Sequence, residues 1–394
     1  MARFGTSAPR GSKTFTRGRS VLRAALGVCV IGLLLAFSAP TASLAAEKIT
    51  TPVIAKAVEW ADANGASSWV STGEAAAGEA VTFRLTGTLP SDWDKFTNYF
   101  YEFDDAPDKA LVVDTSSVTV ELTDEEGTKK QDLTSAFVVA GPASAGSTWT
   151  ASCDDLKAAA SNAVASDRVV LTYTATLDPA LATPGLDNEK TNVSYLRYSS
   201  KPYNNVIGQS KEAEAHVVTW GLDLNKVDSN DANKTLSGAA FTIQGEDGRY
   251  VQADGSLGAS VYEFESDSDG RVSVTGLASG FYTVAETRAP EGYNMLSAPF
   301  RVQLSADLSS DNPGLTVTIP ESNASMQVDA YAGVASVRVP NVRSGGGSQG
   351  TNPTFTKMPQ TGDPSFSAPV ALMGCLGAAC VAVALLIRRA GRIG

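Results

Sequence analysis

The central part of this chain is a succession of short segments in which apolar and polar residues alternate. Residues 80–85 (Ala-Val-Thr-Phe-Arg-Leu) and 168–175 (Arg-Val-Val-Leu-Thr-Tyr-Thr-Ala) are typical, and each is about one strand long. A period of two places one face of a strand in a core and the other in solvent. Clusters of Gly, Pro, Asn and Asp separate these segments, as turns do. The pattern predicts an all-β protein built from tandem immunoglobulin-like sandwiches.

One short helix interrupts the predicted strands. Ser152 can cap a segment that has Asp155 in its first turn and Leu156 on its apolar side. We therefore expect one helix in the first of the sandwiches.

The two ends of the chain have a different composition from the middle. Residues 1–45 combine scattered basic residues with the apolar run 24–37 and small residues before Ala46, which predicts a secretory signal peptide. Residues 368–387 are apolar, and Arg388, Arg389 and Arg392 follow them, which predicts a transmembrane segment with a basic cytoplasmic tail. Everything between the two segments is then exported.

Charge and residue usage exclude several classes of function. The 394 residues carry a net charge of −11, and many of the basic residues lie in the two end segments, so nucleic acid is not expected as a partner. His216 is the only histidine, so a Ser-His-Asp triad or a histidine-rich metal site lacks its parts. We expect no enzyme activity towards other molecules, no metal and no cofactor.

Cysteine usage raises the question of how an exported chain of this kind is stabilised. Of the four cysteines, only Cys153 lies outside the two end segments, so no intrachain disulfide can form. Some other means of stabilisation is needed.

The middle of the chain divides near residue 218, where a polar stretch gives way to a new alternating strand. We predict one β-sandwich domain over 46–217 and a second over 218–343. Residues 344–357 are rich in Gly, Ser and Thr, so they are expected to form a flexible spacer.

A pentapeptide precedes the apolar C-terminal segment. It consists of Met358, Pro359, Gln360, Thr361 and Gly362. It resembles the sortase sorting signal of Gram-positive surface proteins, Leu-Pro-any-Thr-Gly, with Met in place of Leu, a residue of similar volume. The resemblance implies that 358–394 is a sorting signal. It also implies that a sortase cleaves after Thr361 and holds its carbonyl as a thioester until an amine attacks.

The second predicted domain contains the most specific internal pattern. Residues 282–293 (Tyr-Thr-Val-Ala-Glu-Thr-Arg-Ala-Pro-Glu-Gly-Tyr) resemble the E-box of the Cna-B-like domains of pilins and adhesins, with matching segments at 224–228 and 337–342. The resemblance implies an intramolecular isopeptide bond between Lys226 and Asn341, with Glu286 as the acid.

The chemistry of such a bond sets requirements on these three residues. Amide formation needs a neutral amine, so burial must lower the pKa of Lys226 well below its usual value of ~10.4. Glu286 must carry a proton, polarise the Asn341 carbonyl and pass the proton to departing ammonia. The alternative is a surface ion pair of Lys226 with Glu286, in which Asn341 only turns the chain.

The first predicted domain shows a more diffuse version of the same pattern. Its segments 78–83, 101–105, 172–177 and 192–199 resemble the isopeptide-forming fimbrial domain of such pilins. By position, the resemblance implies Lys56 as the amine, Asn192 as the amide and Asp105 as the acid, with Asp104 a close rival. The alternative is a sandwich without a crosslink.

Polymerisation into a pilus requires one further, exposed lysine that attacks the thioester of another subunit. Related pilins often carry it in a Tyr-Pro-Lys-like segment, which is not present here. Lys201 is our first candidate, and Lys190 and Lys211 lie in the same part of the sequence.

Taken together, these resemblances identify the chain as similar to the sortase-assembled pilins of Gram-positive bacteria. They imply a backbone subunit of a covalent, cell-wall-anchored pilus that supports adhesion. The implied partners are a class C pilin polymerase, a housekeeping sortase, other pilin subunits, peptidoglycan and a host surface ligand. The alternative is a singly anchored adhesin, or a minor tip or basal pilin that binds a host ligand. A secreted hydrolase would need catalytic residues that we do not find.

Overall fold

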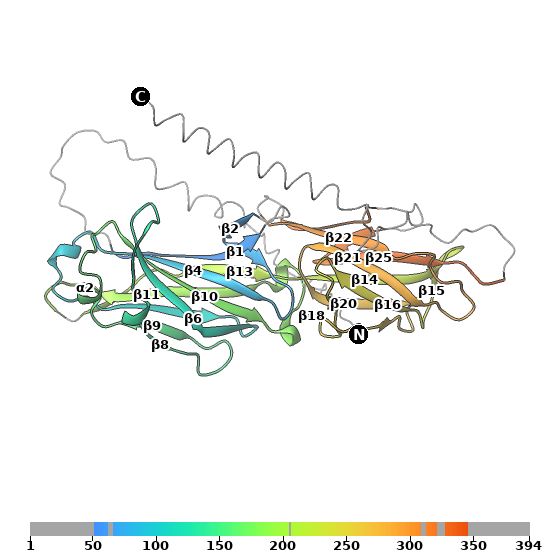
Figure 1. The fold of residues 1–394 in the computed structure, drawn as a ribbon, viewed down its shortest axis with the longest axis horizontal. Coiled ribbons are helices and arrows are strands. Elements are labelled where there is room, and N and C mark those ends of the chain that lie inside the picture. Colours follow the sequence, from blue (N-terminus) through green and yellow to red (C-terminus); the bar gives the residue numbers. More distant parts are fainter. Residues whose placement is uncertain (1–50, 62–65, 205, 309–312, 321–327, 346–394) are drawn as a thin grey trace, which may run out of the picture.

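The computed structural model describes residues 51–345, with gaps at 62–65, 205, 309–312 and 321–327. Strands dominate, and their four sheets follow one another in two pairs along the long axis of the molecule (Figure 1). The predicted all-β fold class is confirmed. The predicted signal peptide, sorting signal and transmembrane segment lie outside the described residues. Among the residues described, no helix has the length and apolar character needed to cross a membrane.

Two sheets form the first domain. The first sheet has the order β2 (Ser67–Val70), β1 (Ile54–Ala61), β4 (Ala80–Thr88), β10 (Arg168–Leu177), β6 (Leu111–Thr123) and β7 (Lys129–Asp132). The second has the order β3 (Thr72–Glu74), β13 (Ala213–Val218), β11 (Lys190–Ser199), β5 (Tyr101–Pro107), β9 (Trp149–Cys153) and β8 (Val138–Ala140), and β12 (Ile207–Gln209) also pairs with β11. Neighbouring strands are antiparallel apart from the parallel pair β3 and β13.

Helical structure in this domain is confined to short turns. The helix α2 (Leu156–Ala159) is a single turn, and the 3-10 turns are Trp93–Lys95, Thr134–Ala136, Pro179–Leu181 and Leu186–Asn188. The predicted cap was wrong, because the Asp155 carboxylate, and not Ser152, accepts hydrogen bonds from the first backbone N–H groups of the helix. Ser152 belongs to β9 instead.

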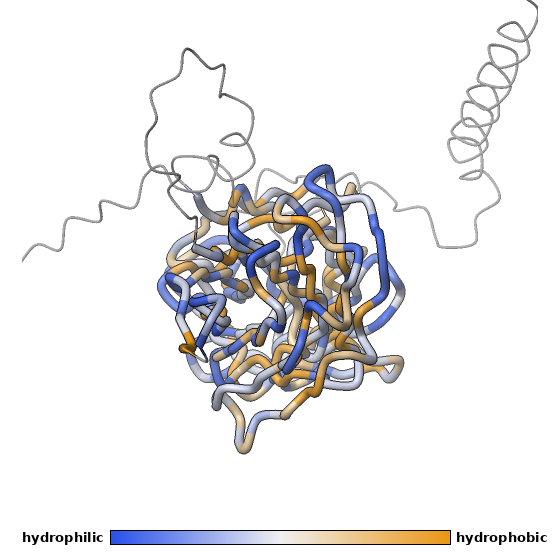
Figure 2. The backbone as a smooth tube through the Cα atoms, turned by 90° about the vertical axis from the view of Figure 1, so that its left-hand side faces the viewer, coloured by the Kyte–Doolittle hydropathy of each residue, from blue (hydrophilic) through white to orange (hydrophobic). Residues whose placement is uncertain are grey.

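Alternation along the strands builds the core as the sequence predicts. In β10, Val169, Leu171, Tyr173 and Ala175 are buried, and the residues between them are partly exposed. Figure 2, which views the molecule from the first-domain end, likewise shows hydrophilic and hydrophobic residues alternating along the backbone. Tyr173 packs between Phe83 and Trp149, so aromatic rings fill the space between the two sheets.

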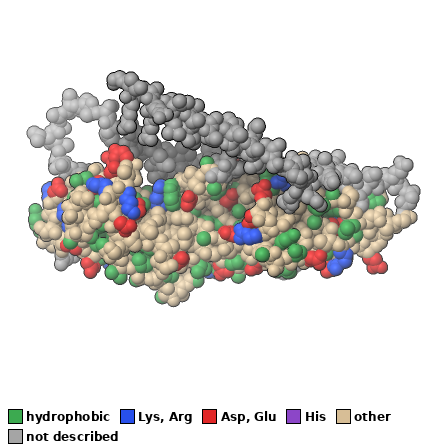
Figure 3. Space-filling model, viewed as in Figure 1, with side chains coloured by type: hydrophobic (Ala, Val, Ile, Leu, Met, Phe, Trp, Pro, Cys, Tyr) green, Lys and Arg blue, Asp and Glu red, His purple; other side chains and the backbone are tan. Residues whose placement is uncertain are grey.

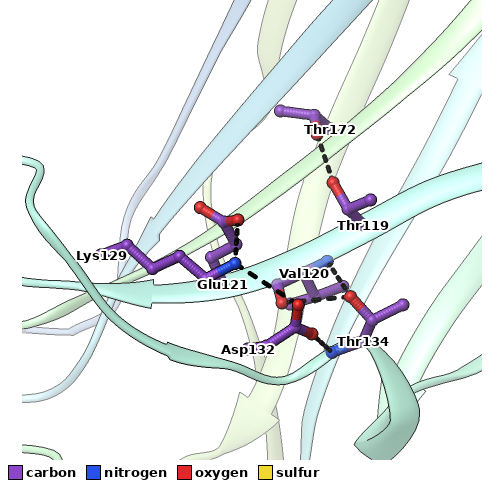
Figure 4. Close-up of polar contacts among 7 residues, drawn as sticks. All are labelled: Thr119, Val120, Glu121, Lys129, Asp132, Thr134 and Thr172. Carbon is purple, nitrogen blue, oxygen red and sulfur yellow. Dashed lines mark hydrogen bonds and ion pairs between the residues drawn. The ribbon is translucent and has the colours of Figure 1, made fainter.

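The outer edge of the first sheet is polar. Lys129 on the edge strand β7 lies 2.6 Å from Glu121 of β6, and Asp132 accepts a hydrogen bond from the backbone of Thr134 (Figure 4). Charged side chains on an edge strand oppose pairing with strands of other molecules. On the face drawn in Figure 3, acidic and basic side chains lie interspersed.

Two more sheets form the second domain. The first contains β15 (Asp231–Thr235), β14 (Trp220–Asp228), β25 (Val334–Asn341) and β24 (Val328–Tyr331), and β20 (Arg271–Leu277) also pairs with β14. The second has the order β18 (Leu257–Gly258), β17 (Tyr250–Val251), β16 (Ala240–Gly245), β21 (Gly280–Arg288), β22 (Phe300–Asp307) and β23 (Gly314–Thr318), and β19 (Phe264–Glu265) pairs with β16. The first and last strands, β14 and β25, lie side by side and parallel.

The two sandwiches have separate cores and meet at a polar joint. Buried apolar residues from Val58 to Val217 form one core, and those from Val218 to Val339 form the other. At the joint, Glu74 of the first domain accepts hydrogen bonds from Trp220 Nε1 (2.6 Å) and Ser279 Oγ (2.9 Å) of the second. A backbone hydrogen bond from Ala77 to Gly276 and an ion pair of Glu79 with Arg249 also cross the joint, so Glu74 is one of several links between the two domains.

Replacing Glu74 with Ala is expected to destabilise this joint. The Trp220 side chain is fully buried, so its N–H group would lose its acceptor at a cost of about 1–3 kcal/mol. In urea denaturation of residues 51–345, the Glu74→Ala variant should have a lower unfolding midpoint than the wild type. Glu126→Ala, at an exposed turn, is the control and should leave the midpoint unchanged. Equal midpoints for the two variants would contradict this role of Glu74.

Candidate functional site

The pairing of β14 with β25 brings Lys226 next to Asn341. Residues 226 and 339 are register partners, as are 228 and 341, so the Lys226 side chain extends along the last strand. Its Nζ donates hydrogen bonds to the Asn341 side-chain oxygen and, at 3.0 Å, to the Val339 carbonyl. Lys226 and Asn341 are both fully buried. A surface ion pair is therefore excluded as the arrangement of these residues.

Glu286 reaches the same pocket from β21 in the facing sheet. Its Oε1 lies 3.4 Å from Lys226 Nζ and accepts a 2.8 Å hydrogen bond from Asn341 Nδ2. Its Oε2 accepts a 2.6 Å hydrogen bond from the backbone N–H of Leu296, which fixes the carboxyl group. The expected contact with the Asn341 carbonyl was wrong. Glu286 instead accepts a hydrogen bond from the side-chain nitrogen of Asn341, and Lys226 donates one to the side-chain oxygen of Asn341.

Burial favours the neutral amine at this position. The pKa of Lys226 is lowered to about 8, because removal from water disfavours its charged form more than the nearby Glu286 favours it. The ring of Phe241 lies 5.9 Å from Nζ and adds to the apolar surroundings. A fraction of the amine is thus available as a nucleophile near neutral pH.

The first domain brings Lys56 and Asp105 together across its two sheets. Lys56 projects from β1 and Asp105 from β5, and both side chains are buried. Lys56 Nζ donates hydrogen bonds to Asp105 Oδ2 and to Ser194 Oγ, the latter at 2.6 Å. Burial lowers the pKa of Lys56 to about 8 against the opposing charge of Asp105.

Asn192 joins this cluster through a tyrosine. Asn192 and Ser194 are alternate residues of β11 and are both fully buried. Asn192 Nδ2 donates a 2.5 Å hydrogen bond to the Tyr173 hydroxyl, which in turn donates to Asp105 Oδ2 at 3.0 Å. The structure thus connects all three residues predicted for this domain in one buried network.

Asp104 faces away from that network. It is adjacent to Asp105 on β5, so its side chain points to the opposite face of the sheet. There, burial and the neighbouring Glu102 raise the pKa of Asp104 to about 6. The geometry therefore favours Asp105 over its rival.

The three candidate linking lysines differ in exposure. Lys190 is buried and donates hydrogen bonds to Thr183 Oγ1 (2.6 Å) and the Asn188 carbonyl (2.9 Å), so it does not meet the requirement for an exposed amine. Lys201 and Lys211 are exposed. Lys201 lines a polar pocket of about 280 Å³ together with Thr97, Asn98, Ser199, Pro202, Tyr203 and Asn204.

Residues 358–362, which carry the predicted sortase motif, lie outside the described residues. Tyr173 and Ser194 are the site residues that sequence reasoning missed. Tyr173 occupies an inward position of an alternating strand, and a buried tyrosine needs a partner for its hydroxyl, so its position was a usable signal. Ser194 follows Asn192 by two residues on the same face of β11, which was a second signal.

Residues 221–320 match the family model described as SpaA: Prealbumin-like fold domain. A search of curated proteins found no match. Among solved structures, the group B streptococcus pilus 2b backbone protein is similar at 18% identity, with a TM-score of 0.51 over 69% of this chain and 96% of that one. A 35 kDa C-terminal fragment of the major pilin GBS80 of Streptococcus agalactiae is similar at 18% identity, with a TM-score of 0.50 over 65% and 92%.

At this level of identity, the similarity to solved structures shows the fold. The family match covers most of the second sandwich, including Lys226 and Glu286. Residues 221–320 therefore form a prealbumin-like domain of the SpaA family, in a chain whose described part has the fold of Gram-positive pilus backbone proteins.

Proposed function

We propose that this chain is a backbone pilin that is polymerised head to tail on the surface of a Gram-positive bacterium. The observation that carries the proposal is the placement of Lys201 and the end of β25 at opposite ends of the molecule. β11 starts at Lys190, beside the joint, and runs to Ser199 at the pole that also contains α2 (Figure 1). β25 starts at the joint, where the backbone of Gly221 pairs with Gly333, and ends at the opposite pole beside β15.

This polarity suits end-to-end linkage. A chain that leaves the second domain after Asn341 departs from one pole, and the exposed Lys201 amine is at the other. The polar pocket around Lys201 would receive the C-terminal threonine of the preceding subunit. The proposed partners are thus a sortase of the polymerising class and further copies of this chain, and a housekeeping sortase would transfer the finished polymer to peptidoglycan through Thr361.

We also propose that each domain forms one intramolecular isopeptide bond. In the second domain, neutral Lys226 Nζ attacks the Asn341 side-chain carbonyl carbon and a new C–N bond forms. Glu286 Oε1 lies between the attacking and departing nitrogens, so it accepts the excess proton from Nζ and delivers one to Nδ2. The C–Nδ2 bond then breaks, ammonia leaves, and the carboxyl group is regenerated.

The mechanical consequence follows from the strand positions. The bond would join the first and last strands of the second domain, so tension applied along the chain would pass through covalent bonds instead of the hydrogen bonds between strands. A pilus fibre built from such subunits would withstand this tension and so support adhesion. This answers the question raised by the lack of disulfides.

An immunoblot of cell-wall extracts tests polymerisation. Antibody against residues 51–345 should reveal a ladder of high-mass species that is resistant to boiling in detergent. A single anchored species would favour the adhesin alternative and overturn the proposal of a backbone role.

The lowered pKa of Lys56 predicts a specific dependence of stability on pH. In Asn192→Ala, Lys56 stays a free amine with a folded-state pKa of about 8, against about 10.4 when unfolded. Between these values the unfolded chain binds the extra proton, so stability rises with pH, by up to about 1.4 kcal/mol per pH unit. Chemical denaturation at pH 7, 8.5 and 9.5 should show this rise. The double variant Asn192→Ala/Lys56→Met should lack it, and parallel curves would contradict the assignment.

A further inference from the structure

The two proposed crosslinking sites differ in how the acid reaches the amide. In the second domain, Glu286 contacts the Asn341 nitrogen directly, at 2.8 Å. In the first domain, no hydrogen bond joins Asp105 to Asn192 among the described residues. The Tyr173 hydroxyl stands between them instead, 3.0 Å from Asp105 Oδ2 and 2.5 Å from Asn192 Nδ2.

Side-chain length accounts for the difference. Aspartate is one methylene shorter than glutamate. Asp105 Oδ2 contacts Lys56, Ser194 and Tyr173, and Asp105 Oδ1 is buried but forms no hydrogen bond with Asn192 or any other described residue. In this position the carboxyl group can accept the proton of the attacking Lys56 amine, but it has no contact through which to protonate the departing Asn192 nitrogen. The nearest hydroxyl to that nitrogen belongs to Tyr173.

We propose that the Tyr173 hydroxyl is the catalytic group that protonates the departing nitrogen of Asn192 when the first-domain isopeptide bond forms. This inference rests on the proposed crosslink between Lys56 and Asn192. Asp105 and Tyr173 together would perform the task that Glu286 performs alone in the second domain.

The proton path balances at every step. Neutral Lys56 Nζ attacks the Asn192 carbonyl carbon, and the excess proton on Nζ passes to Asp105 Oδ2. The Asn192 nitrogen becomes tetrahedral, so its lone pair is no longer delocalised and turns into a proton acceptor. Tyr173 then gives its hydroxyl proton to this nitrogen and takes the proton of Asp105. The C–N bond breaks, ammonia leaves, and both Tyr173 and Asp105 return to their starting states.

The surroundings of Tyr173 suit such a relay. In the resting state Asn192 donates to the hydroxyl oxygen, and rotation about the C–O bond reverses the direction of that hydrogen bond once the nitrogen can accept. The ring is held between Phe83, with ring centres 5.4 Å apart, and Trp149, at 4.9 Å, so the oxygen cannot move away. Burial and the charge of Asp105 raise the pKa of Tyr173 well above 10, so the hydroxyl keeps a proton until the nitrogen needs it.

The test uses mass spectrometry to follow formation of the first-domain crosslink in the part of the chain between the two end segments. In Tyr173→Phe, the ring packing is kept and the proton donor is lost, so first-domain crosslinking should slow by roughly 100-fold or more. Tryptic digests of samples taken at intervals after purification report the joined Lys56 and Asn192 peptides. Tyr99→Phe is the matched control, because Tyr99 is equally buried and its hydroxyl has no hydrogen-bond partner among the described residues. This control should crosslink as fast as the wild type.

A rescue variant separates chemistry from structure. In Tyr173→Phe/Asp105→Glu, the longer carboxyl group should reach the Asn192 nitrogen directly and act as the general acid. First-domain crosslinking should then be at least ~10-fold faster than in Tyr173→Phe alone. The second-domain bond, read in the same digests, shows that the second domain has folded in every sample, and near-UV circular dichroism of each variant against the wild type shows whether the aromatic core of the first domain has formed. Equal rates for Tyr173→Phe and the wild type would overturn the role of Tyr173 and leave the crosslink intact. Unlinked Lys56 and Asn192 peptides in the wild type would overturn the crosslink itself, and the relay with it.

Discussion

Replacing Glu286 with Gln is expected to leave Lys226 and Asn341 unlinked, so the folded protein should be heavier by one ammonia molecule than the wild type, apart from the substitution itself. Gln keeps the shape of Glu and can still accept the hydrogen bond from the Leu296 N–H group. It cannot take a proton from Lys226 or deliver one to the Asn341 nitrogen. The expected loss of the crosslink is therefore a loss of proton transfer.

The loss of this bond should also lower stability by a large amount. A crosslink between residues 115 positions apart restricts the unfolded chain, and by analogy with disulfides that close loops of this size it contributes about 5 kcal/mol. For a domain of this size, the midpoint of thermal unfolding should fall by roughly 15–20 °C. Calorimetry and intact-mass measurement on the same samples check both effects.

The matched control is Glu291→Gln, at an exposed position of the same domain. It makes the same chemical change without touching the pocket, so mass deficit and melting temperature should match the wild type. A Glu286→Gln protein that still lacks ammonia would show that another group transfers the proton. Our assignment of Glu286 would then be wrong.

Replacing Lys201 with Arg is expected to abolish the high-mass ladder of cell-wall extracts. The guanidinium group keeps the positive charge but stays protonated, so it cannot attack a thioester. Lys201 is exposed in a polar pocket at one pole, so the change should leave folding and both intramolecular crosslinks unaffected. The immunoblot should show a single species that is still attached to the cell wall.

Lys211→Arg serves as the control for this experiment. Lys211 is exposed and lies only ten residues further along the chain, after β12. The ladder should persist in this variant. If the ladder instead persists in Lys201→Arg and is lost in Lys211→Arg, subunits are linked through Lys211 and the pocket around Lys201 has another role.

Most of the fold was accessible from the sequence because strand alternation is a local property. The inward residues of 168–175 were visible in the sequence, and β10 buries them as expected. The helix shows the limit of such local signals. Both Ser152 and Asp155 are good capping residues, and pairing of β9 with β5 and β8 decided that Ser152 belongs to a strand.

The residues of the second site were also accessible, because a recognisable pattern of segments marks Lys226, Glu286 and Asn341. Their mutual geometry was not. Which atom of Asn341 faces Glu286 depends on the parallel register of β14 with β25 and on how the facing sheet is placed over them. These are non-local relations that no segment contains.

The sequence by itself determined the β-sandwich class, and it predicted the lysines, acids and asparagines of the two buried clusters and the export of a middle part with a single cysteine. Only the tertiary structure decided that Asp105 and not Asp104 faces Lys56, that Tyr173 enters the first site, and that Lys190 is buried. The physical reason is the same in each case. Residue type sets what a side chain can do, but the packing of two sheets against each other sets which side chains share a pocket from which water is excluded.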